Sequence, residues 1–293
     1  MKVAALSRRT LTLSALLAPA ALVVLVFFGS GVIQALAQSF GYQPLLTGWR
    51  WSTAAYQDLF SDPTVQASVW LTLRVAVIPT LLSAVLGIGA ALLIRRLGRG
   101  KRWIAAVFSA NLAVPHLVGA LCMTLLLAQS GLASRVGFAL GLSSSPADFP
   151  ALTQDGFGVA IMAEYVWKET PFLAVIALAA LGRGVTELED AARALGAGPW
   201  QRFRSVTLPI IAGPVAAGSV LVFAFAAGSY EVPYLLGQPY PATLPVVALQ
   251  KFQDSDLTSR PLAMAVSVLI VGFSVALVAG YLFLAGRASR RTL

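Results

Sequence analysis

The chain has 293 residues, of which 58% are hydrophobic and only 11% charged. Soluble domains usually carry about 25% charged residues, so this composition excludes an ordinary water-soluble protein and indicates lipid as the main solvent. The formal net charge of +9 does not indicate a nucleic-acid partner, because the basic residues lie in short stretches between apolar runs rather than interleaved with polar and aromatic groups.

Six apolar runs are each long enough to cross a bilayer, which takes about 20 residues. The sequence therefore predicts an all-α polytopic membrane protein with six transmembrane helices, at residues 13–36, 67–94, 104–129, 159–181, 210–234 and 262–284. We expect residues 1–12 to precede the membrane and residues 13–293 to form one membrane domain. Prolines inside the runs, such as Pro115 and Pro171, are interpreted as packing kinks, since neighbouring helices can satisfy the freed carbonyls.

The first run admits a second interpretation. Arg8 and Arg9, an apolar stretch and then Ala35-Leu36-Ala37 resemble a secretory signal with a small-residue cleavage site. The apolar region of a signal peptide is only about 7–15 residues long, and this run is longer. We therefore expect a retained first helix, and a mature N-terminus at Gln38 would contradict that expectation.

The Lys and Arg residues predict the orientation. With a cytoplasmic N-terminus, 15 of the 21 lie in cytoplasmic segments, and the 4 in external segments are Arg50, Arg135, Lys251 and Arg260. Cytoplasmic loops of membrane proteins carry an excess of Lys and Arg. Both termini are therefore expected in the cytoplasm.

A few charged residues lie within or beside the predicted spans. An ionisable group at the bilayer centre costs about 2.5–3.5 kcal/mol on insertion scales, so it usually faces a partner or water. Glu164 and Lys168 are four residues apart in the favourable order for a helical ion pair, and Arg74 could pair with Glu164 or Glu169. Two interpretations stay open: these residues line a solute path, or they fix helix packing. Glu231 lies near the outer end of the fifth predicted span, where it could line the solute path or lie at the membrane–water interface.

His116 is the only histidine and follows Pro115 in the third predicted span. No Cys, Asp or Glu lies near it at the spacing of a metal-ligand motif. We therefore predict no metal site.

Residues 182–209, between the fourth and fifth spans, differ from the other loops. Thr186 and Glu189 have capping-box spacing, which predicts a helix start there. Gly196 would allow the positive φ that ends this helix, and Gly198-Pro199 would open a second one. The first helix would carry one apolar stripe, at Leu188, Ala191, Ala192 and Leu195.

Such a helix pair has a face of mostly small side chains, which lets the backbone of another protein approach closely. The same pattern also suits an amphipathic hairpin that lies on the lipid surface. The residues alone give both interpretations comparable weight.

The loop resembles the EAA motif of binding-protein-dependent ABC importer permeases. The family pattern is Glu-Ala-Ala, three residues, Gly, nine residues, Ile, one residue, Leu-Pro. Here Asp190-Ala191-Ala192, Gly196, Val206 and Leu208-Pro209 stand at that spacing without a gap. Asp replaces Glu and Val replaces Ile, and Glu189 could supply the carboxylate instead. Weaker similarities to the family lie at residues 58–63, 167–172, 230–237 and 260–265. The last two segments resemble the polyamine, sulfate and ferric-iron branch of the family.

The resemblance implies a type I ABC importer permease fold and a subunit that forms a solute translocation path. In this family the motif loop forms a coupling helix that docks in a groove of a cytoplasmic ATPase. By resemblance the contact residues are Glu189, Asp190, Ala191, Ala192, Leu195, Gly196 and Ala197. The path candidates are Arg74, Glu164, Lys168, Glu169 and Glu231.

The resemblance also implies the partners: two cytoplasmic ATP-binding subunits, a second permease subunit expected to be a paralogue, and a periplasmic or extracellular solute-binding protein. The sequence has no Gly-x-x-x-x-Gly-Lys-Ser/Thr loop, so we expect no cofactor in this chain and ATP with Mg on the partner. We expect a non-catalytic subunit of a bacterial inner membrane transporter. Its solute would be a small polar or charged compound of the polyamine, oxyanion or ferric-iron class.

An alternative is an ion-coupled secondary transporter that moves protons or ions through Glu164, Lys168 and Glu169.

Overall fold

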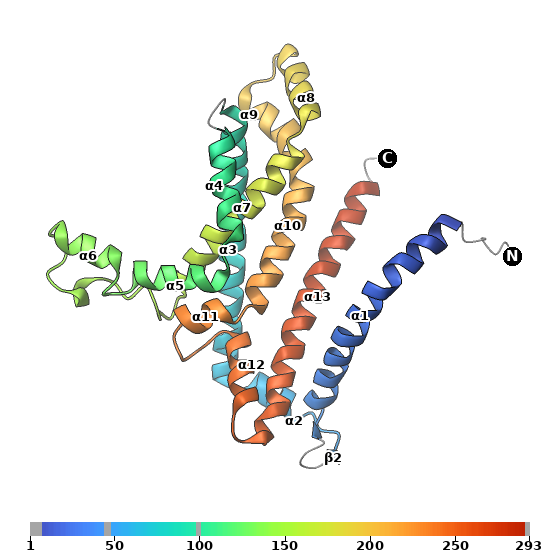
Figure 1. The fold of residues 1–293 in the computed structure, drawn as a ribbon, viewed down its shortest axis with the longest axis vertical. Helices are drawn as coiled ribbons and strands as arrows, with labels where there is room; N and C mark the ends of the chain where they lie inside the picture. Colours follow the sequence, from blue (N-terminus) through green and yellow to red (C-terminus); the bar gives the residue numbers. More distant parts are fainter. Residues whose placement is uncertain (1–7, 44–47, 98–100, 291–293) are drawn as a thin grey trace. The chain divides into compact units, whose positions relative to one another are not determined.

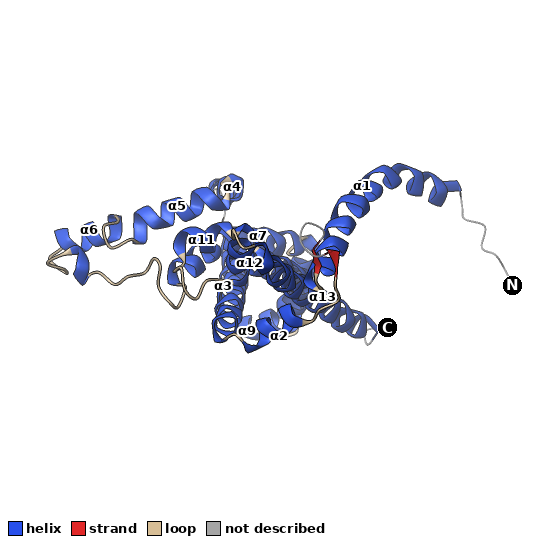
Figure 2. Cartoon of the chain, turned by 90° about the horizontal axis from the view of Figure 1, so that it is seen from below, coloured by secondary structure: helices blue, strands red, loops and turns tan. Residues whose placement is uncertain are grey.

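The computed structural model describes residues 8–43, 48–97 and 101–290. Helices make up nearly all of this part of the chain, and its two strands, β1 (Tyr42–Gln43) and β2 (Gly48–Trp49), pair antiparallel (Figure 2). The helices are α1 (Arg8–Ser39), α2 (Ala54–Ser61), α3 (Pro63–Arg96), α4 (Lys101–Ala113), α5 (His116–Leu127), α6 (Leu132–Ala139), α7 (Val159–Ala180), α8 (Arg183–Ala194), α9 (Pro199–Arg202), α10 (Leu208–Gly228), α11 (Glu231–Leu236), α12 (Leu244–Gln253) and α13 (Arg260–Arg290) (Figure 1). Two short 3-10 helices, Pro146–Asp148 and Leu257–Ser259, and a π-helix, Phe203–Thr207, complete the set.

The described chain divides into two compact units. The first contains the residues up to Ser61 together with Ala248–Leu269. The second contains Asp62–Val247 and the residues from Ile270 on. α12 and α13 each pass from one unit into the other.

Unit one is built on α1, which is apolar yet exposed along most of its length, with Leu25, Phe27 and Phe28 each more than 70% exposed. A water-soluble helix would bury such side chains, so this surface is suited to lipid. At the end of α1 the Ser39 and Tyr56 hydroxyls are 2.9 Å apart. This hydrogen bond ties α1 to α2.

Unit two has a core formed by α3, α7 and α10, joined by α5 and α11. Small residues let these helices approach closely, as is usual in membranes. A Cβ atom on Gly87 of α3 would lie 3.0 Å from the backbone nitrogen of Ala174 in α7. On α10, a Cβ atom on Gly218 would lie 2.6 Å from the Ile176 side chain. Gly87 thus lets the α7 backbone approach α3, and Gly218 gives the Ile176 side chain its present position against α10.

The prediction of an all-α polytopic membrane protein is confirmed, with five to six candidate spans in the described residues. Among the described residues, 5 helical stretches are long and apolar enough to cross a membrane, and the count reaches 6 when α7 is joined across a bend to α8. Four predicted spans, at residues 13–36, 67–94, 159–181 and 262–284, fall on α1, α3, α7 and α13.

The third predicted span, residues 104–129, is not one continuous helix. The chain breaks at Val114-Pro115 into α4 and α5, and Figure 1 shows α5 turning away from the direction of α4. Pro115 has φ −62° and ψ 145°, an extended conformation. Proline lacks the N–H that would continue the helix, and its ring disfavours helical geometry in the preceding residue. The interpretation of Pro115 as a packing kink was therefore wrong.

The fifth predicted span, residues 210–234, ends early. α10 ends at Gly228, and the separate helix α11 begins at Glu231. The interruption, Ser229 and Tyr230, is only two residues long and lies between two apolar segments, so hydropathy averaged over a whole span does not reveal it.

Candidate functional site

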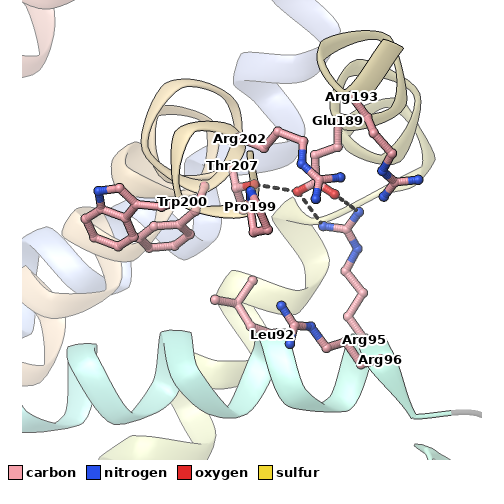
Figure 3. A pocket seen from close by; sticks show the side chains of 10 residues that line it. Leu92, Arg95, Arg96, Glu189, Arg193, Pro199, Trp200, Arg202 and Thr207 are labelled. Atoms are coloured by element: carbon pink, nitrogen blue, oxygen red, sulfur yellow. Dashed lines mark hydrogen bonds and ion pairs between the residues drawn. The ribbon is translucent and has the colours of Figure 1, made fainter. Parts of the chain in front are cut away.

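The start of α8 differs from the predicted one. Gly182 is the N-cap of α8, so Thr186 and Glu189 lie inside the helix and do not form a capping box. Both side chains instead meet Arg95 at the C-terminal end of α3, and Figure 3 shows the Glu189 contact. The capping-box prediction was wrong because Glu189 bonds to Arg95, 94 positions away, and such a distant contact leaves no signal in the neighbouring sequence.

Glu189 ties three segments together. Its carboxylate accepts two hydrogen bonds from the Arg95 guanidinium, at 3.0 Å from Nη1 and 2.7 Å from Nη2. The Thr207 hydroxyl, just before α10, donates to the same carboxylate. Bidentate arginine–carboxylate pairs are among the strongest side-chain hydrogen bonds. Glu189 therefore links α8 to the end of α3 and to the start of α10.

The surroundings of Glu189 favour its ionised form. Partial burial raises the pKa of this carboxyl, but the hydrogen bonds from Arg95 and Thr207 and the positive charges of Arg95 and Arg202 lower it more. The net effect holds the Glu189 pKa below its ordinary value. The link is therefore charged at neutral pH.

The end of α8 is a glycine-dependent turn. Gly196 has φ +85°, its N–H bonds to the Arg193 carbonyl at 2.9 Å, and the Ala197 N–H bonds to the Ala192 carbonyl at 3.0 Å. These two bonds form a Schellman motif, in which glycine supplies the left-handed residue. The prediction of a positive φ at Gly196 is confirmed.

A second helical segment follows the turn. Gly198 is the N-cap of α9 and Pro199 stands at its first position, as predicted. The π-helix then widens the backbone spiral before α10, and the Leu208 N–H bonds to the Phe203 carbonyl. π-helical turns are rare and are frequent at functional sites.

The outer face of the 182–209 loop has no partner within the described chain. Leu188 is 54% exposed and Leu195 90%, although both are large and apolar. Asp190 is also exposed and pairs with Arg193 at 2.9 Å. The face formed by Leu188, Ala191 and Leu195 is called the elbow face below.

The sequence left open whether Asp190 or Glu189 supplies the motif carboxylate. Glu189 is bound inside the chain by Arg95 and Thr207, whereas Asp190 is exposed and makes only the i,i+3 pair with Arg193. Asp190 is thus the carboxylate available to another protein, and Glu189 fixes the position of the loop.

A pocket of 590 Å³ lies behind the elbow, between the end of α3, α8 and the segment from α9 to the π-helix (Figure 3). Its lining residues are Leu92, Arg95, Arg96, Glu189, Arg193, Pro199, Trp200, Arg202, Phe203 and Thr207. Arginine is the most frequent residue in this lining.

A second polar cluster lies at the α4–α5 break and centres on His116. His116 Nδ1 is 3.1 Å from Glu164 Oε1, and His116 Nε2 is 3.6 Å from Glu169 Oε1. Glu164 is fully buried. Gly119 makes room for this carboxylate, since a Cβ atom there would lie 2.7 Å from Glu164 Oε1.

Lys168 does not pair with Glu164, so the predicted i,i+4 ion pair was wrong. Its Nζ donates to the carbonyls of Asn111 at 2.7 Å and Val114 at 2.6 Å. These carbonyls lie where Pro115 interrupts the helix. The lysine is drawn to the broken helix end because carbonyls at membrane depth need a donor.

Arg74 does not pair with Glu164 or Glu169, which corrects the second predicted ion pair. Its Nη1 donates to the Gly156 carbonyl at 3.4 Å, and its guanidinium carbon lies 4.6 Å from the centre of the Phe157 ring. Glu231 is exposed at the first position of α11, where a negative charge interacts favourably with the helix dipole.

His116 and Arg95 are the residues that the sequence did not identify as parts of these clusters. His116 is 48 positions from Glu164, so no spacing rule connects them. The position of His116 directly after a helix-breaking proline was the only local signal.

Three comparisons bear on identity. The family described as "Binding-protein-dependent transport system inner membrane component" matches residues 83–288. The putrescine transport system permease protein PotI of Escherichia coli (strain K12) is 28% identical over 249 residues, covering 84% of this chain and 82% of that protein. A probable molybdenum ABC transporter permease protein of Haloferax volcanii is 32% identical over 201 residues, 68% of each chain.

Among solved structures, a bacterial alginate ABC transporter in complex with an alginate pentasaccharide-bound periplasmic protein aligns with a TM-score of 0.78. The alignment covers 96% of each chain at 18% identity. The likeness shows a shared fold.

Proposed function

Because the chain belongs to the family of binding-protein-dependent transport system inner membrane components, we propose that its elbow face receives force from an ATPase on another polypeptide. The chain is a transmembrane permease subunit of an ATP-binding cassette importer and a multi-pass inner membrane protein. The predicted resemblance to this family is confirmed. The family does not favour the alternative of an ion-coupled secondary transporter.

One observation carries the proposal: an exposed apolar face on a loop that is rigidly tied to two membrane helices. The contact residues are Asp190, Ala191, Ala192, Leu195, Gly196 and Ala197, with Glu189 holding the helix from behind. Because Glu189 links α8 to α3 and α10, a displacement of the elbow moves the ends of both helices. Such rigid movement is what alternating access requires.

The elbow face suits a protein groove better than a lipid surface. Leu188 and the C-cap residue Leu195 are its only large side chains, Ala191 lies between them, and Gly184 precedes Leu188 on the same side of the helix. Small residues let another backbone approach closely, whereas a lipid-bound helix gains most from bulky apolar side chains. This difference favours docking over the interfacial hairpin.

The partners follow from this assignment. Two cytoplasmic ATP-binding subunits would carry ATP and Mg. A second permease subunit, expected to be a paralogue, would complete the translocation path. A periplasmic or extracellular solute-binding protein would deliver the solute. The present chain would have no catalytic role. The alginate transporter of the same fold, solved with its periplasmic protein, supports this arrangement.

A cytoplasmic location for the elbow would place both termini in the cytoplasm of a bacterial cell. Within unit two, the basic end of α3, the start of α4 and the end of α13 lie toward the same end as α8 (Figure 1). This grouping of basic helix ends supports the proposed orientation.

The solute would be a small polar or charged compound of the polyamine, oxyanion or ferric-iron class. The relatives named for putrescine and molybdenum support the first two classes. Glu164 and Lys168 are fully engaged inside the helix bundle, which favours a packing role for them. Glu169 is buried too and lies 3.6 Å from His116. Arg74 is half-buried and Glu231 exposed, so these two are the stronger path candidates.

Co-purification tests the elbow assignment. Leu195→Glu puts a charge at the centre of the elbow face, and we expect the ATPase to be lost from the purified complex and ATP-driven uptake to fall at least about tenfold, as for an interface hot spot. Leu142→Glu, at another highly exposed leucine, is the matched control and should retain both. Normal ATPase binding by the Leu195 variant would refute the assignment.

A further inference from the structure

The pocket behind the elbow is strongly basic. Four arginines line it, at Arg95, Arg96, Arg193 and Arg202, against a single acidic lining residue, Glu189. Figure 3 shows Glu189 already joined to Arg95 and Thr207. This one carboxylate cannot balance the charge of four arginines.

Two of the arginines have unused hydrogen-bond donors. Arg193 pairs with Asp190. Arg96 and Arg202 make no side-chain hydrogen bond or ion pair with any other residue that the structure describes. Arg96 is exposed to solvent, whereas the Nε of Arg202 is buried without a hydrogen-bond partner. A buried charged donor without a partner is costly, and an anion in the pocket would supply that partner.

The shape and chemistry of the pocket specify the anion. A guanidinium presents a planar set of donors that matches phosphate oxygens, and it holds phosphate more specifically than a lysine does. Leu92, Trp200 and Phe203 add an apolar wall, and the Trp200 and Phe203 rings lie 5.4 Å apart. A ligand with a phosphoryl head and an apolar remainder would satisfy both parts of the pocket.

The position of the pocket indicates where such a ligand comes from. It lies at the C-terminal end of α3, a 34-residue helix long enough to cross the membrane. Basic pockets between transmembrane helices on the cytoplasmic side bind phospholipid headgroups, and tryptophan is enriched at that depth. A soluble phosphate has the same head chemistry but no use for the apolar wall.

We propose that this pocket is a phosphoryl-binding site in which Arg96 and Arg202 hold the phosphate, while Trp200 and Phe203 contact the apolar remainder of an anionic phospholipid. The site is distinct from the elbow face, because Leu188, Ala191 and Leu195 do not line the pocket. A bound headgroup would connect the end of α3 to α9 and stiffen the base of the elbow.

Lipid titration tests the proposal without reference to transport. The full chain, purified with its partner subunits in zwitterionic detergent, is titrated with phosphatidylglycerol, and the bound lipid is counted by native mass spectrometry. Arg96→Gln and Arg202→Gln should each weaken the tightest binding about tenfold, the loss expected for one charge-assisted hydrogen bond. Arg204→Gln removes the same charge from an exposed position that does not line the pocket, and it should leave binding unchanged.

A second arm distinguishes the sources of phosphate. Inorganic phosphate at millimolar concentration should not displace the lipid. Displacement at that concentration would support phosphate recognition by the pocket but assign it to a soluble ligand.

Arg96→Lys keeps the charge and should recover part of the binding. Should Arg202→Gln fail to assemble, Arg96→Gln decides alone, because Arg96 is exposed at a helix end. Equal phosphatidylglycerol binding by the wild type, Arg96→Gln and Arg204→Gln would overturn the proposal.

Discussion

At the residue scale, Glu189 stabilises the loop that carries the EAA-like motif without itself facing the proposed ATPase partner. Its neighbour Asp190 occupies the motif position, yet Glu189 makes the contacts that hold α8 in place. Deleting one member of such a buried network leaves the other member's charge without a partner. The loop should therefore loosen when Glu189 is neutralised, even though the elbow face itself is intact.

We expect Glu189→Gln to raise the hydrogen-exchange rate of the amides in α8 about tenfold, because charge-assisted bonds of roughly 1.5–3 kcal/mol become ordinary ones. Hydrogen exchange followed by mass spectrometry measures this rate. Asp190→Asn, which removes an exposed pair of little energetic value, is the matched control. Equal protection in both variants would show that Glu189 does not hold the loop.

The pH dependence of this link has a definite sign. The pKa of Glu189 is held below its ordinary value, so the stabilisation is present above the unfolded-state pKa and is lost as the pH falls through the depressed folded-state pKa. Protection of α8, corrected for intrinsic exchange, should therefore stay constant between about pH 7 and 5.5. A loss of protection in that range would indicate that another group controls the link.

At the scale of elements, the break between α4 and α5 depends on Lys168 of α7. Pro115 removes the N–H that would bond to the Asn111 carbonyl in a continuous helix, and the Lys168 amine donates to that carbonyl at 2.7 Å. A lysine that looks like a path residue in the sequence thus completes a broken helix. Its charge is further surrounded by Glu164, Glu169 and His116 on neighbouring turns.

We predict that Lys168→Met destabilises the purified protein by about 2–4 kcal/mol, since two carbonyls each lose a hydrogen bond from a charged donor. Pro115→Ala should rescue part of this loss, because it restores the missing N–H. Thermal unfolding in detergent measures both effects, and Lys251→Met is the control for loss of a lysine outside the core. Strictly additive effects of the two substitutions would contradict the link between Pro115 and Lys168.

At the scale of the whole molecule, the distribution of charge predicts the sidedness on which the proposed function depends. Most of the basic residues fall in segments that alternate with the spans, and the elbow lies in one of these segments. A coupling surface must be on the same side of the membrane as the ATPase.

Cysteine labelling tests the sidedness. In a Cys122→Ser background, Leu195→Cys should react with a membrane-impermeant maleimide only when the cytoplasmic face is exposed, and Arg135→Cys only from outside, because the positive-inside rule puts these positions on opposite sides. Labelling of right-side-out and inverted vesicles gives the readout. The reverse pattern would remove the elbow from reach of any cytoplasmic ATPase.

The sequence by itself determined most of the spans, the family, the end of α8 and the start of α9. These features depend on local patterns: runs of about 20 apolar residues, the spacing from Asp190 to Pro209, and Gly196 followed by Gly198-Pro199. Each is written in neighbouring residues, so it can be read without the fold. The two interruptions, at Pro115 and after Gly228, were missed because each is only a few residues long and lies between apolar segments.

Only the tertiary structure decided which charges meet. Arg95 reaches Glu189 over 94 positions, and His116 reaches Glu164 over 48, whereas the sequence predicted pairs of Lys168 with Glu164 and of Arg74 with Glu164 or Glu169. The physical reason is that a buried charge takes the partner that the packing of helices brings to it. In this chain, small residues such as Gly87 and Gly119 set that packing, and the spacing of charges along one helix does not.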